Sequence, residues 1–135
     1  MGYCIYLIKS EFYLPGKFSE EALQAIKKLH GRETISDLGE AHFSFVNSSE
    51  FLRATTLQDA LDAWRWLAEE DEEGNIIELD FLGEKLGDER KLFEAIAPYV
   101  REGSQIQMVG DDGEIWRWLF QNGSVIRQPG KAVFS

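Results

Sequence analysis

The chain has 135 residues, of which 44% are hydrophobic and 13% aromatic, and its formal net charge is −10. This composition supplies the core of roughly one domain and excludes wholesale disorder. The negative charge disfavours direct binding to nucleic acid, because that affinity comes largely from lysine and arginine side chains that neutralise phosphates.

Cysteine content and hydropathy predict a soluble cytoplasmic protein. The single cysteine, Cys4, cannot form an internal disulfide, which suits a reducing compartment. The apolar run at 3–8 is too short for the hydrophobic region of a secretory signal, and no apolar stretch approaches the length of a membrane span. We therefore expect neither export nor contact with a membrane.

The N-terminal part predicts a strand region followed by a helix. Residues 3–14 are rich in Tyr, Ile and Phe and predict a strand or strand pair, which Pro15 and Gly16 end. Ser19 then predicts the cap of a helix with apolar residues on one face, and this helix is expected to end at residues 30–31.

Two further elements are expected before the middle of the chain. The run 42–46 alternates as a half-buried strand with its phenylalanines facing inward. A second helix is expected to begin at Thr55 or Thr56. Its apolar stripe consists of Leu57, Ala60, Leu61, Trp64 and Leu67.

An acidic turn and a strand follow this helix. The run 69–73 leads to a turn at Gly74 and Asn75, and residues 77–81 then alternate as a strand with one solvent-facing side. The inward-facing set of this strand is Ile77, Leu79 and Phe81, and the outward-facing set is Glu78 and Asp80.

The last third predicts a helix and a β-meander. Asp88 is expected to cap a helix that Pro98 bends or ends. Three strands joined by turn sequences then follow, at 105–109, 114–121 and 124–128. The whole chain, 1–135, is therefore expected to form a single α+β domain with about three helices, a mixed or antiparallel sheet and a C-terminal three-stranded antiparallel meander.

Negative charge is concentrated in one stretch of the chain. Residues 69–90 carry ten acidic and two basic side chains, a local charge of −8, whereas the rest is nearly balanced. A field of that sign attracts basic surfaces and repels phosphates. The candidate partner-binding residues of this stretch are Glu69, Glu70, Asp71, Glu72 and Glu73. The alternative is a solvated face that only aids solubility.

All four tryptophans belong to two copies of the sequence Trp-Arg-Trp-Leu, at 64–67 and 116–119. On the predicted strand, Trp116 and Trp118 share one face and Arg117 points to the other. Two interpretations stay open. The rings pack in the core, as aromatic residues on a sheet usually do, or all three residues form a partly exposed patch of the kind found at interface hot spots.

A calcium site is a weaker alternative for the acidic stretch. With Gly74 as the sixth position of a calcium-binding loop, the ligands would be Glu69, Asp71, Glu73 and Asp80. Three features count against this register: a glutamate at the first position, an aspartate at the last, and an exiting segment that alternates like a strand.

Catalytic chemistry has few candidates. Cys4 and His42 could form a dyad only if their predicted strands pair. No pair of carboxylates stands out for hydrolysis, and the sequence has no phosphate-binding or cofactor motif. We therefore expect neither a catalytic residue nor a cofactor.

Three runs of the sequence resemble a group of small bacterial and phage-associated proteins. They are Gly-Glu-Lys-Leu-Gly-Asp-Glu at 83–89, Ala-Pro-Tyr-Val at 97–100 and Gly-Asp-Asp-Gly-Glu-Ile-Trp-Arg-Trp at 110–118. The resemblance covers about 42–121. That group has no established activity, so the resemblance implies a bacterial accessory protein of unknown function and assigns no site residue.

The function expected from these observations is protein interaction. The concentrated charge and the poverty of catalytic residues favour a non-enzymatic, inhibitor-like or immunity-like module that binds a protein with a basic surface. A small-molecule or calcium-binding module is the alternative, and a carboxylate-dependent enzyme is a second alternative. The sequence gives no indication of the oligomeric state.

Overall fold

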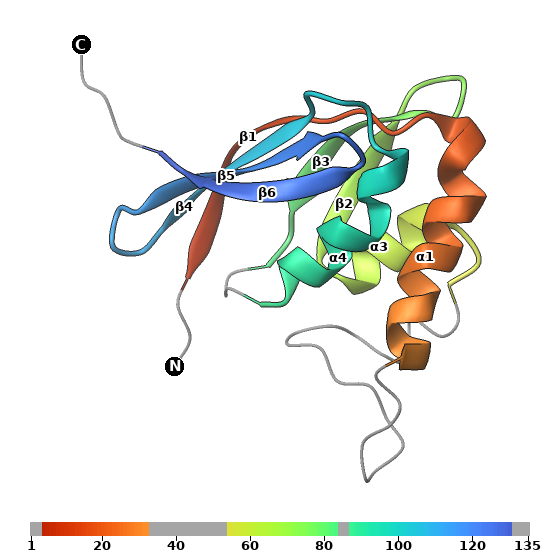
Figure 1. Cartoon of the computed structure of the whole chain (residues 1–135), viewed down its shortest axis with the longest axis horizontal. Helices are drawn as coiled ribbons and strands as arrows, with labels where there is room; N and C mark the ends of the chain where they lie inside the picture. The colour runs from red at the N-terminus through yellow and green to blue at the C-terminus, as the bar shows by residue number, and fades with distance from the viewer. Residues whose placement is uncertain (1–3, 33–53, 84–86, 131–135) are drawn as a thin grey trace, which may run out of the picture.

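The computed structural model describes residues 4–32, 54–83 and 87–130. Within them the chain forms three α-helices and six strands (Figure 1). The helices are α1 (Ser19–Arg32), α3 (Leu57–Ala63) and α4 (Glu89–Ile96), with the 3-10 helices η1 (Gly16–Phe18) and η2 (Ala97–Tyr99). The strands are β1 (Ile5–Glu11), β2 (Trp66–Glu70), β3 (Ile76–Phe81), β4 (Gln105–Gly110), β5 (Ile115–Gln121) and β6 (Ser124–Pro129). The predicted α+β class is confirmed, and the strand predicted at 42–46 lies outside the described residues.

Four strands form an antiparallel sheet in the order β1-β4-β5-β6. Its last three strands are the predicted C-terminal meander, which is confirmed. The turn between β5 and β6 places Asn122 and Gly123 at φ values of 54° and 73°. A two-residue hairpin turn of type I′ requires this left-handed conformation at both central positions, and an Asn-Gly pair adopts it readily.

The core lies between this sheet and the helices. Alternation along β5 buries every second side chain, so Trp116, Trp118 and Phe120 face inward. Phe93 of α4 packs edge-on against two of these rings, at centroid distances of 5.4 Å from Trp118 and 5.8 Å from Phe120. The described helices gather on one side of the strands (Figure 1). The other face of the sheet carries the less buried half of the alternation.

Strands β2 and β3 form a separate antiparallel hairpin. The hairpin is joined to the N-terminal segment by Leu14 and Ile76, whose backbone groups exchange two hydrogen bonds of 2.9 Å. In addition, the Ser10 hydroxyl accepts a hydrogen bond of 3.3 Å from the Leu79 N–H. These contacts fix the hairpin beside β1.

The helix α3 begins where the sequence predicts it. Thr56 is the N-cap, because its hydroxyl accepts a hydrogen bond of 3.2 Å from the Asp59 N–H. The strongly apolar stripe of this helix is buried against α1 and β2. Its buried members are Leu57, Ala60, Leu61 and Ala63.

The expected extension of this helix to Leu67 is wrong. The helix ends at Ala63, and Arg65 adopts a left-handed φ of 74° that turns the chain into β2. This reversal buries Trp66, whose ring lies 5.3 Å from that of Phe93, and leaves Leu67 46% exposed. Burial of the Trp66 ring in the core, together with strand pairing, outweighs the local preference for one more helical turn.

The inward-facing set of β3 also differs from the prediction. The pairing register shifts between Glu69 and Glu70, so two residues of β3 face one of β2 at this point. Ile76 and Leu79 are fully buried, whereas Ile77 is 44% exposed. Ile77 was expected in the core, and that placement is wrong because the bulge takes it out of the alternation.

The starts of α1 and α4 lie close to their predicted positions. Ser19 is the first residue of α1, which continues directly from η1 instead of starting at a capped turn. Asp88 occupies the N-cap position of α4, although its side chain accepts no capping hydrogen bond. None of the described helices combines the length and the apolar character needed to cross a membrane.

Candidate functional site

The acidic run forms the tip of the β2–β3 hairpin. We call residues 66–81 the acidic hairpin, because they include seven acidic side chains and no lysine or arginine. Six of these carboxylates are exposed: Glu69, Glu70, Glu72, Glu73, Glu78 and Asp80. The seventh, Asp71, is half-buried.

Asp71 builds the turn of the acidic hairpin. Its Oδ1 accepts hydrogen bonds from the backbone N–H groups of Glu73 and Asn75, at 2.9 and 3.0 Å, and its Oδ2 accepts one of 2.9 Å from the Asn75 side chain. These bonds, chiefly the one from the Asn75 side chain, hold the pKa of Asp71 below its usual range. The role of Asp71 is therefore structural, unlike that of its acidic neighbours.

The turn is docked onto the body of the protein. The Gly16 N–H donates a hydrogen bond of 2.8 Å to the Asn75 side-chain oxygen. The two segments approach so closely that a Cβ at Gly16 would lie 2.7 Å from the carbonyl oxygen of Gly74. A glycine at position 16 is thus required, and the acidic carboxylates are presented by a fixed turn.

Like charges face each other across the hairpin. Glu69 lies directly opposite Glu78, and a hydrogen bond to Glu69, together with the charge of that residue, raises the pKa of Glu78. Within the described part of the chain, no lysine or arginine forms an ion pair with any carboxylate of the acidic hairpin. The surface therefore concentrates negative charge that these residues leave uncompensated.

Apolar side chains are exposed on the same hairpin. Leu67 is 46% exposed and pairs with Asp80, and Ile77 is 44% exposed. Leu82, just beyond β3, is 52% exposed. Helix and strand periodicity in the sequence wrongly place Leu67 and Ile77 in the core. They add apolar contact area beside the carboxylates.

The fold around the acidic turn differs from that of the calcium-binding loop considered as an alternative. Strands flank the acidic turn on both sides, where a calcium-binding loop of this type requires helices. Glu69 and Asp80 lie along these strands, and Asp71 already uses both carboxylate oxygens within the turn. Among the described residues, no three His, Cys, Asp or Glu side chains group closely enough to hold a metal ion.

The tryptophans of the second Trp-Arg-Trp-Leu copy belong to the core. Trp116 is 1% exposed and Trp118 is 5% exposed. Arg127 lies over the ring of Trp116 at 4.6 Å, and Arg90 lies over that of Trp118 at 5.3 Å. The alternative of an exposed patch that includes these two rings is therefore wrong. Arg117 lies on the opposite face of the sheet.

Two other groups of ionisable residues have structural positions. Cys4 is half-buried, and its backbone N–H donates a hydrogen bond to the Asp111 side chain. His42 lies outside the described residues, so the dyad of Cys4 and His42 stays a prediction. Arg65 and Glu89 form an ion pair of 2.5 Å in which Glu89 is only 2% exposed. Burial raises the pKa of Glu89 and lowers that of Arg65. The sequence gives no signal for this pair, because 24 residues separate its members.

Comparison of the chain with models of protein families, with curated proteins and with solved structures found no match. The resemblance to phage-associated proteins therefore stays a prediction.

Proposed function

We propose that this protein is a non-enzymatic interaction protein, of an inhibitor or immunity type, that captures a protein partner through the acidic hairpin. The partner carries a basic surface, and it is neither a nucleic acid nor a membrane. The interaction takes place in the cytoplasm, in keeping with a bacterial accessory role.

One observation carries this proposal: six exposed carboxylates lie on one docked hairpin, without an ion pair to any described lysine or arginine. A solvated face that only aids solubility needs no fixed geometry. Here the turn is held by Asp71, by Asn75 and by its contact with Gly16. A preorganised charged surface loses less side-chain and loop entropy when it binds.

The acidic hairpin supplies both charge, which speeds association, and apolar contact area, which slows dissociation. Its charge steers a basic partner and raises the association rate, chiefly at low ionic strength. Its exposed apolar side chains, Leu67 and Ile77, are suited to the contacts that slow dissociation.

The test is capture from a lysate of the native host, followed by kinetics with the captured partner. The full chain is immobilised at low salt, beside a hairpin variant in which four carboxylates are changed to lysine: Glu69, Glu70, Glu72 and Glu73. We expect a basic protein to bind the natural chain and to elute with salt. Its association rate constant should fall by about tenfold or more in the hairpin variant.

A second variant separates the hairpin from net charge. It carries the same number of Glu or Asp to Lys changes at exposed positions elsewhere, namely Glu21, Asp62, Glu94 and Glu102. Capture should persist in this matched variant. If both variants lose the partner equally, or if association is independent of salt, the acidic hairpin is not the binding surface and the proposal fails.

A further inference from the structure

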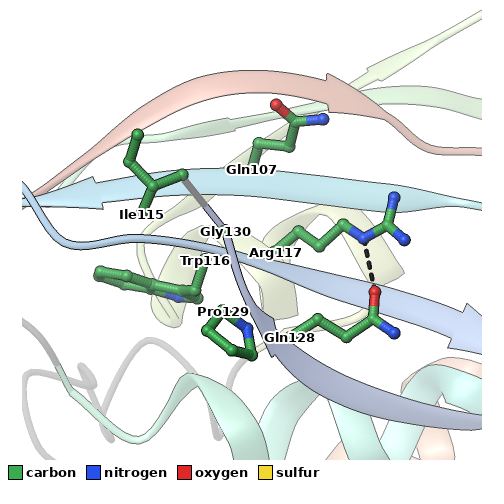
Figure 2. Close-up of a pocket in the computed structure, with 7 residues that line it drawn as sticks. All are labelled: Gln107, Ile115, Trp116, Arg117, Gln128, Pro129 and Gly130. Carbon is green, nitrogen blue, oxygen red and sulfur yellow. Dashed lines mark hydrogen bonds between the residues drawn. The ribbon is translucent and has the colours of Figure 1, made fainter. Parts of the chain in front are cut away.

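The face of the four-stranded sheet that points away from the core carries a pocket. A row of directly paired residues crosses this face, from Lys9 on β1 through Gln107 and Arg117 to Gln128 on β6. The pocket has a volume of about 540 Å³, within the range of small-ligand sites. Figure 2 shows the residues that line it, which are Gln107, Ile115, Trp116, Arg117, Gln128, Pro129 and Gly130.

Amide oxygens orient the Arg117 guanidinium in this pocket. Its Nε donates a hydrogen bond of 2.7 Å to Oε1 of Gln128, which Figure 2 shows as a dashed line, and its Nη1 donates one of 3.1 Å to Oε1 of Gln105. The same oxygen of Gln105 accepts a bond of 3.0 Å from Gln107. These neutral partners fix the direction of the guanidinium without cancelling its charge, and they occupy only part of its donors.

Other arginines of the protein have different surroundings. Arg65 is paired with the carboxylate of Glu89, and Arg127 with that of Glu114. The guanidinium groups of Arg90 and Arg101 lie over aromatic rings. Among the arginine side chains that the structure describes, Arg117 alone is held by two amide oxygens.

We infer that this pocket binds a carboxylate group carried on an apolar body. The planar guanidinium fork matches the geometry of a carboxylate, and its half-buried position strengthens the interaction. Ile115, which shares the outward face of β5 with Arg117, supplies apolar wall beside the charge. The protein has a net charge of −10, and its acidic hairpin is proposed to bind a basic partner. The Arg117 pocket has the opposite charge preference and selects an anionic ligand.

Two sources can supply this chemistry: a small organic acid, or an acidic side chain of a peptide. The experiment titrates the ¹⁵N-labelled full chain with benzoate, and separately with an end-blocked peptide containing Phe-Glu. Benzamide and the corresponding Phe-Gln peptide are the neutral controls. We expect saturable shifts of the amide signals of Gln107, Arg117 and Gln128 with a carboxylate and not with its control. Saturation by benzoate alone assigns a small acid, and saturation by the peptide alone assigns a peptide side chain.

Substitutions locate the site within the same spectra, which also report whether each variant folds. Arg117→Gln should weaken carboxylate binding about tenfold or more, since it removes a charged hydrogen bond. Arg117→Lys keeps the positive charge but lacks the planar guanidinium fork. Its affinity for the carboxylate should lie between that of the natural chain and that of Arg117→Gln. Arg101→Gln is the matched control and should leave binding unchanged, because its guanidinium lies over Tyr13 and does not line the pocket. The inference is overturned if the neutral controls bind equally well, if Arg101→Gln weakens binding as much as Arg117→Gln, or if no carboxylate saturates.

Discussion

Arg65 and Glu89 hold the chain in place where it leaves α3. The left-handed φ of Arg65 starts the reversal, and its carbonyl accepts a hydrogen bond of 2.8 Å from the Leu82 N–H. The guanidinium then lies 5.1 Å from the Phe81 ring and pairs with Glu89, whose second oxygen accepts from the Gly87 N–H. One ion pair thus ties the α3–β2 junction to the start of α4.

Loss of one member of this pair should be costly. Glu89→Ala leaves the Arg65 guanidinium largely buried without its carboxylate, and we expect the free energy of unfolding to fall by about 3 kcal/mol. Urea unfolding measures this loss. Glu94→Ala, on the exposed side of the same helix, is the control and should change stability little. Equal effects of the two substitutions would show that the pair contributes nothing specific.

Burial also gives Glu89 a characteristic pH dependence. Its pKa is raised in the folded protein, so between the ordinary value and the raised one the folded state binds more protons than the unfolded chain. Stability should therefore fall as the pH rises through this window. In Glu89→Gln the fall should disappear, although this variant is less stable throughout. Unfolding measured across this pH range decides the point, and an unchanged slope in the variant would contradict it.

At the scale of the element, the acidic hairpin depends on one aspartate for its turn. Asp71→Ala removes the acceptor for the N–H groups of Glu73 and Asn75. We expect a lower melting temperature and faster hydrogen exchange at these two amides, whereas Glu72→Ala should change neither. Because the pKa of Asp71 is lowered on folding, its contribution is present above the ordinary aspartate value and is lost as the pH falls through the lowered one. Unaltered exchange in Asp71→Ala would exclude this role.

Repulsion between its own carboxylates destabilises the acidic hairpin. Glu78→Gln removes the repulsion across the pair with Glu69, so the melting temperature at neutral pH should rise. The rise should vanish in acid, where a proton shared by the pair already relieves the repulsion. Asp80→Asn is the control, because Asp80 lies opposite Leu67 and should give a smaller change. Calorimetry at the two pH values measures both variants, and a lower melting temperature in Glu78→Gln would contradict the expected repulsion.

At the scale of the whole molecule, the sequence predicts elements whose signals are local. The meander follows from alternation along β5 and from the Asn122-Gly123 turn, and both are present in the structure. The reversal at Arg65 could not be predicted, because its cause is the burial of Trp66 against Phe93, which is distant in the sequence. The local preference of a segment for helix or strand is weaker than such long-range packing contacts, which override it.

The candidate sites also combine features that the sequence predicts with features that only the fold reveals. A charge count along the sequence is enough to find the acidic run, since neighbours in a run remain neighbours in a hairpin. The structural role of Asp71 depends on the conformation of its turn, and the pocket around Arg117 depends on side chains from three strands. Register between strands decides which side chains meet, and the sequence of one strand does not contain it.

The two surfaces allow a final prediction about long-range charge, which builds on carboxylate binding at Arg117. Each change of an acid to lysine adds two charges, so the hairpin variant and its matched variant both rise from −10 to −2. If the acidic hairpin repels benzoate only through the overall field, both variants should tighten its binding on the order of twofold at low salt, and to the same extent. The gain should disappear at about 1 M salt, where the screening length is about 3 Å. Tighter binding in the hairpin variant alone would instead show that the hairpin acts directly on the Arg117 pocket, and the two surfaces would then not be independent.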